Sequence, residues 1–288
     1  MTTKYACVAL FACAALALSA CGSKPPVISV GSRNSTEQLI LGEIIAAHLE
    51  KQLPGVQIER KLGLGGPMAV QGAMQSGAID VAVEDVGAMI GTVLNEDVPT
   101  DENVALQRAR NQYQALFQVT VLKPLGFHHR FVVVGKRAGT LTAAGETGTS
   151  VRFGVAHDLA ERKDAFFMLM GKYRLSLREL PKSMDAPAMY EALKAGKIDY
   201  AAGFSTDAWI GEAGFSVLKD DRNLFLDHMS CIVSRNQALA AVPALQKTLD
   251  GLAGKIGDEA IRKMNREADL KHRDPAVVAK EFLAGARL

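Results

Sequence analysis

The sequence predicts an α/β protein with mainly parallel sheets and two lobes that are built alike. Short apolar strands alternate with helical segments along the chain, which is typical of α/β folds. One motif occurs twice. Residues 74–82 have the pattern of a helix end, a glycine, Ile-Asp and a strand, and residues 193–201 have the same pattern in the same order. Two lobes of similar construction would explain the repeat.

The predicted elements follow from hydrophobic periodicity and from glycine and proline breaks. Strands are expected at 26–30, 56–61, 79–83, 131–134, 151–156, 177–180, 198–202, 215–218 and 229–233. Helices are expected at 36–49, 68–76, 88–94, 104–116, 158–173, 186–195, 243–252, 258–268 and 275–283, and another helix is expected to begin near residue 207.

The stretch 31–43 joins the first strand to the first helix. It holds Ser32, Asn34, Ser35 and Thr36, which are all helix N-cap residues, and 35–38 has the spacing of a capping box. Such a turn directs free backbone N–H groups and short hydroxyls toward one point, where ligands bind in open α/β sheets. The pattern alone favours an ordinary well-capped helix.

Composition limits the possible functions. The chain has 288 residues, 48% hydrophobic and 22% charged, so it can bury a sizeable core in one or two domains. The formal net charge is only +2 and there is no long basic run, which argues against nucleic acid as a partner.

Residues 1–20 have the layout of a secretory signal peptide. A positive region at Lys4 precedes an apolar run, residues 8–18, that is too short to span a bilayer. Leu18-Ser19-Ala20-Cys21 resembles the bacterial lipobox, which implies that Cys21 is lipidated and that 21–26 form a tether. We therefore expect a protein anchored by lipid in the periplasm or on the outer face of the cell membrane. A plain signal peptide with a chance cysteine is the alternative.

Cysteine usage excludes an internal disulfide in the mature chain. Of Cys7, Cys13, Cys21 and Cys231, only Cys231 remains free once the signal is removed and Cys21 carries lipid. No CxxC pair or Cys/His spacing typical of zinc occurs.

Residues 31–38, Gly-Ser-Arg-Asn-Ser-Thr-Glu-Gln, resemble the signature of substrate-binding proteins from osmoprotectant-type ABC transporters, the glycine betaine, choline and carnitine family. Further motifs match that family in the same order, at 64–66, 76–80, 124–127, 203–207, 264–265, 273–275 and 278–283. The resemblance covers nearly all of the mature chain. It implies a two-lobed periplasmic-binding-protein fold, type II-like, with two crossover segments.

The resemblance also implies where the lobes divide. Lobe one would comprise 27–127 and 229–288, and lobe two 128–228, with crossovers near 127–130 and 227–231. Ligand would be held in the cleft between the lobes, which close on it.

The function that the resemblance implies is not enzymatic. We expect a monomeric solute-binding lipoprotein that needs no cofactor and delivers a small nitrogenous ligand to the transmembrane subunits of an ABC importer. A ligand-sensing receptor domain without transport, and less favourably a hydrolytic enzyme, remain alternatives. No nucleophile elbow, HExxH motif or phosphate loop supports the enzyme.

Family members that bind trimethylammonium compounds hold them in an aromatic box, because ring faces stabilise a cation that has no N–H to donate. The family's box positions fall on Asp85, Phe131, Phe204 and His228. An acid and an imidazole thus stand where rings are expected, which favours a betaine-like, cationic or zwitterionic ligand other than glycine betaine. The expected ligand-binding residues are Asn34, Thr36, Gln38, Gly65, Gly66, Asp85, His129, Phe131, His157, Phe204, Ser205, Thr206 and His228.

Four of the six histidines, His128, His129, His157 and His228, fall near the predicted cleft or hinge. No pair has i,i+4 spacing and no cysteine joins them, so we expect hinge and ligand hydrogen bonds here and no metal. A histidine beside Asp85 would have a raised pKa, which would make binding depend on pH.

Overall fold

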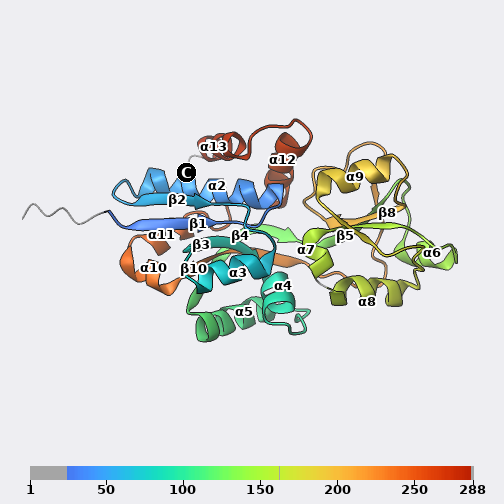
Figure 1. The fold of residues 1–288 in the computed structure, drawn as a ribbon, viewed down its shortest axis with the longest axis horizontal. Coiled ribbons are helices and arrows are strands. Elements are labelled where there is room, and N and C mark those ends of the chain that lie inside the picture. Colours follow the sequence, from blue (N-terminus) through green and yellow to red (C-terminus); the bar gives the residue numbers. More distant parts are fainter. Residues whose placement is uncertain (1–24, 162, 287–288) are drawn as a thin grey trace, which may run out of the picture.

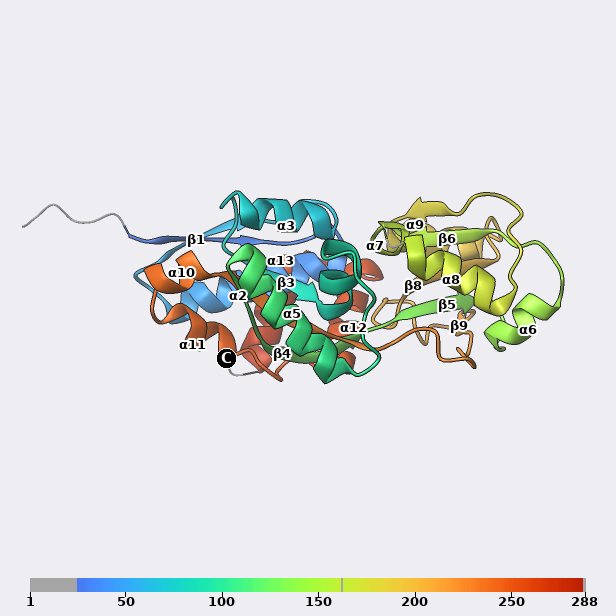
Figure 2. The same cartoon turned by 90° about the horizontal axis from the view of Figure 1, so that it is seen from below.

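The computed structural model describes residues 25–161 and 163–286 and contains two five-stranded sheets with helices on both faces (Figure 1). The view from below shows the same two halves lying side by side along the long axis (Figure 2). In each sheet, three neighbouring strands run parallel to one another. A further strand, which arrives directly from the other half of the molecule, pairs antiparallel with one of these three. The α/β class predicted from the sequence is confirmed.

The first sheet has the order β2-β1-β3-β10-β4. Its strands are β1 (Val27–Gly31), β2 (Gln57–Lys61), β3 (Val81–Asp85), β4 (Val119–His129) and β10 (His228–Arg235). The helices around it are α2 (Thr36–Gln52), α3 (Pro67–Gln75), α4 (Val86–Ala88), the π-helical turn η2 (Met89–Val93), α5 (Glu102–Phe117), α10 (Asn236–Ala241), α11 (Leu245–Asp250), α12 (Asp258–Asp269) and α13 (Pro275–Gly285).

The second sheet has the order β7-β6-β8-β5-β9. Its strands are β5 (Phe131–Gly135), β6 (Phe153–Ala156), β7 (Lys182–Met184), β8 (Tyr200–Phe204) and β9 (Ser216–Val217). The helices around it are α6 (Leu141–Glu146), α7 (His157–Glu161), α8 (Lys163–Tyr173) and α9 (Ala186–Lys194).

The repeated sequence motif occupies equivalent places in the two sheets. Gly77 and Gly196 end α3 and α9 with φ of 76° and 71°, a region that glycine enters without steric cost. Asp80 and Asp199 then accept a hydrogen bond from the backbone N–H of Ser29 (2.9 Å) and of Arg152 (2.8 Å), respectively, beside the neighbouring strand. The repeat therefore reflects one local structure built twice.

Long strands connect the two halves. β4 runs without interruption to His129, only Arg130 separates it from β5, and β10 begins at His228 directly opposite His129. Separate clusters of buried apolar side chains pack against each sheet, and those around the first sheet are the larger. Residues near 129 and 228 therefore lie between the two cores.

Three local predictions are wrong. The capping box at 35–38 does not form: Ser35 makes no side-chain cap, and the Gln38 amide is engaged by Arg33 and Val83. The edge strand beside β6 is Lys182–Met184 and not 177–180, where Leu177 forms just an isolated bridge with Val151. Residues 205–214 form turns and not a helix start.

Within the described residues, no helix is both long enough and apolar enough to cross a membrane. Cys21 and the predicted signal peptide lie outside the described part of the chain.

Candidate functional site

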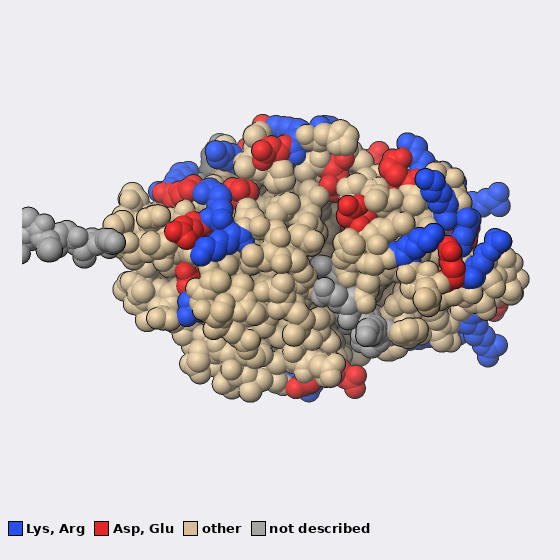
Figure 3. Space-filling view, viewed as in Figure 1, with Lys and Arg blue, Asp and Glu red and all other residues tan. Residues whose placement is uncertain are grey.

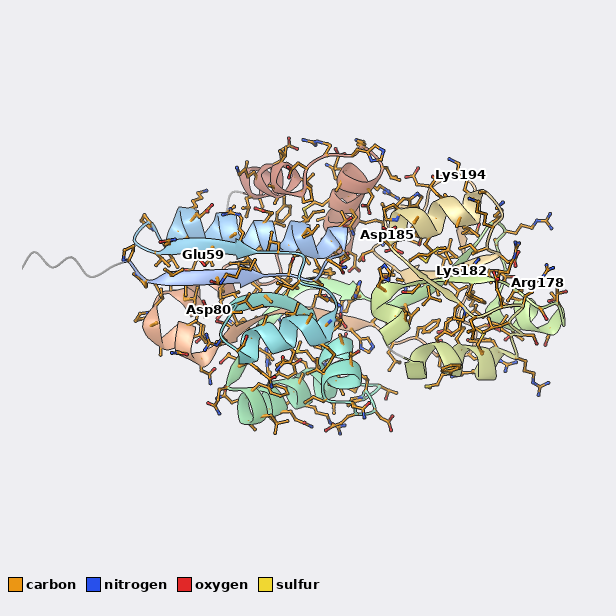
Figure 4. The ribbon with its side chains drawn as sticks, viewed as in Figure 1. Glu59, Asp80, Arg178, Lys182, Asp185 and Lys194 are labelled. Carbon is orange, nitrogen blue, oxygen red and sulfur yellow. The ribbon has the colours of Figure 1, made fainter. Side chains whose placement is uncertain are left out.

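A cavity of about 280 Å³ lies at the boundary between the two halves. Red acidic side chains gather beside this boundary in the space-filling view (Figure 3), and Asp185 lies on the side of its half that faces the other (Figure 4). The cavity is lined by Asn34, Ser35, Thr36, Glu37, His129, Ala156, His157, Met184, Asp185, Ala186, Pro187, Phe204, Thr206, Asp207, Asn265 and Asp269.

The lining comes from the ends of elements in both halves. The first half contributes the loop after β1 with the first turn of α2, the end of β4 and the face of α12. The second half contributes the end of β6, the first turn of α9 and the turn after β8. Because β1, β6 and β8 all end here, the cavity occupies the position where ligands bind in open α/β sheets.

The structure brings six of the thirteen expected ligand-binding residues to this cavity: Asn34, Thr36, His129, His157, Phe204 and Thr206. The other seven, Gln38, Gly65, Gly66, Asp85, Phe131, Ser205 and His228, lie outside its lining.

Several of these seven residues hold the cavity wall in place. Gly65, with a φ of 124°, accepts the backbone N–H of Asn34 at 3.1 Å, and Gly66 is the N-cap of α3. Ser205 Oγ accepts the backbone N–H of Arg130 at 3.3 Å, which ties the turn after β8 to the residue between β4 and β5.

Asp85 belongs to a buried charge network behind the cavity. Its Oδ2 lies 3.1 Å from Nη2 of Arg33, and its Oδ1 accepts the N–H of Ala88 at 2.7 Å, which caps α4. Arg33 is 1% exposed and also faces Glu84 at 3.8 Å. In the amide orientation that satisfies both atoms, Gln38 accepts from Arg33 at 2.8 Å. Burial opposes ionisation of Asp85, but His129 and Arg33 hold its pKa well below the usual range.

His129 connects this network to the cavity. Its Nδ1 lies 3.5 Å from Oδ2 of Asp85 and its Nε2 lies 3.5 Å from Oε1 of Glu37. Burial alone would lower the pKa of His129, but the two carboxylates outweigh it and the pKa is raised. The ring stacks on Phe204 of the second half, with centroids 3.9 Å apart. From the sequence we expected a raised pKa for any histidine that lies beside Asp85, and His129 occupies that position.

The two other predicted box residues are buried away from the cavity. Phe131 contacts Phe204 with ring centroids 5.1 Å apart. His228 packs so closely on Gly87 that a Cβ there would lie 2.3 Å from its ring. Of the four mapped box positions, only Phe204 therefore lines the cavity.

Asp207 is an acid with an unusual environment. Its Oδ2 accepts the backbone N–H of Phe204 at 3.0 Å and the hydroxyl of Tyr190 at 2.9 Å. Burial, with a contribution from the negative charge of Glu37, raises the pKa of Asp207 to about 7, although both hydrogen bonds and His129 act in the opposite direction. Its charge therefore changes near neutral pH.

Helix α12 joins the two halves beside the cavity. Three of its side chains donate to backbone carbonyls of the turn after β8: Arg262 to Ser205 at 3.3 Å, Asn265 to Thr206 at 2.9 Å, and Arg266 to Ala208 at 3.2 Å. These carbonyls accept side-chain donors from α12, which explains why residues 205–214 do not begin a helix.

Sequence reasoning missed the acidic residues and the amide that line the cavity, namely Glu37, Asp185, Asp207, Asn265 and Asp269. Three of them lie within matched motifs, since Glu37 belongs to 31–38, Asp207 to 203–207 and Asn265 to 264–265. Asp185 was detectable as an N-cap before Pro187. No sequence signal placed Asp269 near Thr36, whose hydroxyl donates to it at 2.6 Å.

Among the residues that the structure describes, no group of three or more His, Cys, Asp or Glu side chains is arranged to hold a metal ion.

The family model that describes the substrate binding domain of ABC-type glycine betaine transport systems matches residues 26–285. The chain is 32% identical over 269 residues to an ergothioneine transport permease/ergothioneine binding protein from Helicobacter pylori, covering 90% of this chain and 47% of that protein. It thus spans about half the length of that relative. It is 28% identical over 271 residues to a carnitine transport binding protein from Listeria monocytogenes, covering 91% of this chain and 87% of the relative.

Solved structures support the fold. A glycine betaine/carnitine/choline ABC transporter structure superposes with a TM-score of 0.74 at 24% identity and covers 90% of this chain and 98% of that chain. The glycine betaine complex of a lactococcal binding protein gives a TM-score of 0.63 at 13% identity, with 91% and 96% coverage. The two-lobed periplasmic-binding-protein fold predicted from the sequence is confirmed. Because the family model matches almost the whole described chain, this protein belongs to the family of substrate-binding domains of ABC-type glycine betaine transport systems.

Proposed function

We propose that this chain is an extracytoplasmic solute-binding lipoprotein that delivers a small nitrogenous ligand, betaine-like, cationic or zwitterionic, to the transmembrane subunits of an ABC importer. The observation that carries the proposal is the cavity between the two halves, which is lined by polar and acidic side chains from both. Relatives named for ergothioneine and carnitine binding support a small nitrogenous zwitterion as the class of ligand.

The cavity offers complementary groups to a zwitterion. Carboxylates such as Glu37 and Asp185 can attract a cationic nitrogen. Helices α2 and α9 both begin at the cavity, and Ser35 makes no side-chain cap on α2. Backbone N–H groups in the first turn of a helix favour an anion, so the N-terminus of α2 is suited to the carboxylate of a zwitterionic ligand.

The proposed mechanism is a movement of the two halves relative to each other. The chain between them is short, with Arg130 on one side and the start of β10 on the other. We take 27–127 with 229–288, and 128–228, as the two lobes. Ligand bound by residues of both lobes stabilises the closed arrangement and presents it to the permease.

A thermal-shift screen tests the proposed function directly. We expect at least one of glycine betaine, choline, carnitine, ergothioneine, amino acids and polyamines to raise the Tm, because a ligand that binds only the folded state stabilises it by mass action. A ligand at about 100 times its Kd adds about 2.7 kcal/mol. If none of these solutes at millimolar concentration shifts the Tm, the chain is not a receptor for this class.

Anchoring by Cys21 is tested by Cys21→Ala. We expect the variant protein to be released from the membrane fraction or to remain unprocessed, because the lipid on Cys21 supplies the attachment. Cys231→Ala is the matched control, since Cys231 is a buried residue of β10. Cell fractionation with metabolic labelling by a fatty acid measures both effects. A Cys21→Ala protein that stays membrane-bound and normally processed would contradict the lipoprotein assignment.

A further inference from the structure

The cavity contains carboxylates from both sides of the boundary. Glu37 and Asp269 come from α2 and α12 of the first half, while Asp185 and Asp207 come from α9 and the turn after β8 of the second. No lysine or arginine is among the described residues that line it. His129, placed between Asp85 and Glu37, is the cavity histidine whose pKa is raised.

Like charges therefore face each other across the boundary. Burial and the charge of Glu37 raise the pKa of Asp207, and burial together with the charges of Asp185 and Glu37 raises that of Asp269. Hydrogen bonds to Asp207 from Tyr190 and from the Phe204 N–H, and the charge of His129, only partly offset this. A cation in the cavity would relieve the repulsion between the halves.

Asn265 adds an acceptor to the same wall. Its Nδ2 donates to Oε2 of Glu37 and to the carbonyl of Thr206, both at 2.9 Å, so two acceptors fix the orientation of its amide. The side chain is 3% exposed, and its Oδ1 has no hydrogen-bond partner in the described part of the chain. A buried acceptor without a partner destabilises the unliganded protein, and a donor on a ligand can satisfy it.

Aromatic surface for a methylated cation is scarce. Phe204 is the phenylalanine of the lining, which contains no tyrosine or tryptophan among the described residues. One face of Phe204 is already covered by His129 at an interplanar angle of 13°. A quaternary ammonium would therefore find carboxylates and an amide oxygen, which it cannot satisfy by hydrogen bonds, in place of a box of ring faces.

From these contacts we propose that the ligand carries its positive charge on a nitrogen that bears at least one hydrogen, and that Glu37 and Asp207 bind this N–H cation from opposite lobes. Asn265 positions Glu37 and supplies the additional acceptor. This inference rests on the proposed function and specifies the ligand class for the same cavity.

Two pairs of probes, each differing by a single methyl group, test the inference on the unaltered protein. They are N,N-dimethylglycine with glycine betaine, and N,N-dimethylaminoethanol with choline. The first member of each pair carries an N–H at neutral pH and the second does not. Calorimetry should show at least about tenfold tighter binding of each N–H member than of its quaternary partner, a difference of about 1.4 kcal/mol.

Variants then identify the groups responsible. Glu37→Gln and Asp207→Asn should each weaken the N–H member at least about tenfold and reduce the preference within the pair, because each removes a charged acceptor. Glu191→Gln is the control, since Glu191 is an exposed residue of α9 outside the cavity. Far-UV circular dichroism verifies that each variant is folded.

Proton release gives a readout that a purely structural role would not change. A bound cation lowers the pKa of Asp207, so binding near neutral pH should release protons and tighten as the pH rises from about 6 to about 8. Titrations in two buffers of different ionisation enthalpy measure the release. Asp207→Asn should abolish the proton release that comes from Asp207. The release from His129 should remain, because a bound cation lowers the pKa of His129 as well.

Different results overturn the inference and the proposed function. Equal or tighter binding of the quaternary members overturns the inference, while the solute receptor stands. Failure of all four probes to bind also overturns it, but the proposed function survives if another solute raises the Tm in the screen. Retention of the pair preference in both variants shows that Glu37 and Asp207 do not bind the cation.

Discussion

Replacing Arg33 by methionine is expected to destabilise the folded protein by about 3–5 kcal/mol, because it removes the buried arginine that pairs with two buried carboxylates. Arg33 is 1% exposed and lies between Glu84 and Asp85, at 3.8 and 3.1 Å. The methionine side chain fills much of the same volume, so the loss is mainly electrostatic. Urea unfolding followed by circular dichroism measures the change in free energy.

A surface arginine provides the matched control. Arg60 pairs with Glu43 at 2.9 Å and with Glu50 at 2.5 Å, but its side chain is 30% exposed. Arg60→Met should cost about 1 kcal/mol or less, because exposed ion pairs contribute little to stability. If both variants lose the same stability, Arg33 does not hold a buried network together.

Asp207→Asn is expected to stabilise the protein at about pH 8 by about 1–3 kcal/mol. The folded-state pKa of about 7 lies above the ordinary value of 3.8. The folded state therefore binds more protons than the unfolded chain between these values, and stability falls as the pH rises through that range. Because asparagine does not titrate, the variant avoids this loss of free energy of unfolding, which amounts to up to about 4 kcal/mol. Burial of the new amide N–H costs about 1–3 kcal/mol, so the net gain is smaller.

The pH profile distinguishes this cause from a general change in packing. Urea unfolding of Asp207→Asn between about pH 4 and pH 8 should show a smaller decline than the unaltered protein. A decline should remain at the alkaline end, because the pKa of His129 is raised and its contribution is lost as the pH rises through the folded-state value. Two profiles of equal slope would show that Asp207 titrates normally. A variant that is more stable yet binds an N–H cation less well would show that the acid is retained for binding.

Local signals in the sequence were sufficient for the α/β class and for the repeated motif, but they did not predict strand β4 or helices α6 and α10. The same local structure occurs in both halves at Gly77-Ala78-Ile79-Asp80 and at Gly196-Lys197-Ile198-Asp199. In each, a glycine with a positive φ ends the helix, and the aspartate accepts a backbone hydrogen bond from the segment of the neighbouring strand. Hydrophobic periodicity and these breaks depend on neighbouring residues, which a single sequence contains. The motifs shared with the family occur in the same order over nearly all of the mature chain, and they implied the two-lobed fold.

Which residues line the cavity depends on contacts between segments that are far apart in the sequence. Asp85 aligns with a box position, but a buried arginine from the loop after β1 and a histidine from the end of β4 engage its carboxylate. The sequence predicts Glu37 in the first turn of a helix. It lines the cavity because Asn265, 228 positions away, holds its carboxylate.

The sequence by itself determined the α/β class, the duplicated lobe and the family, since each rests on residues that are close along the chain or on motifs in order. Only the tertiary structure decided which acids meet across the boundary, because Asp185 and Asp207 come from one half and Glu37 and Asp269 from the other. Their pKa values and the ligand that they favour depend on burial and on charges from distant segments, and neither quantity is a property of a local sequence.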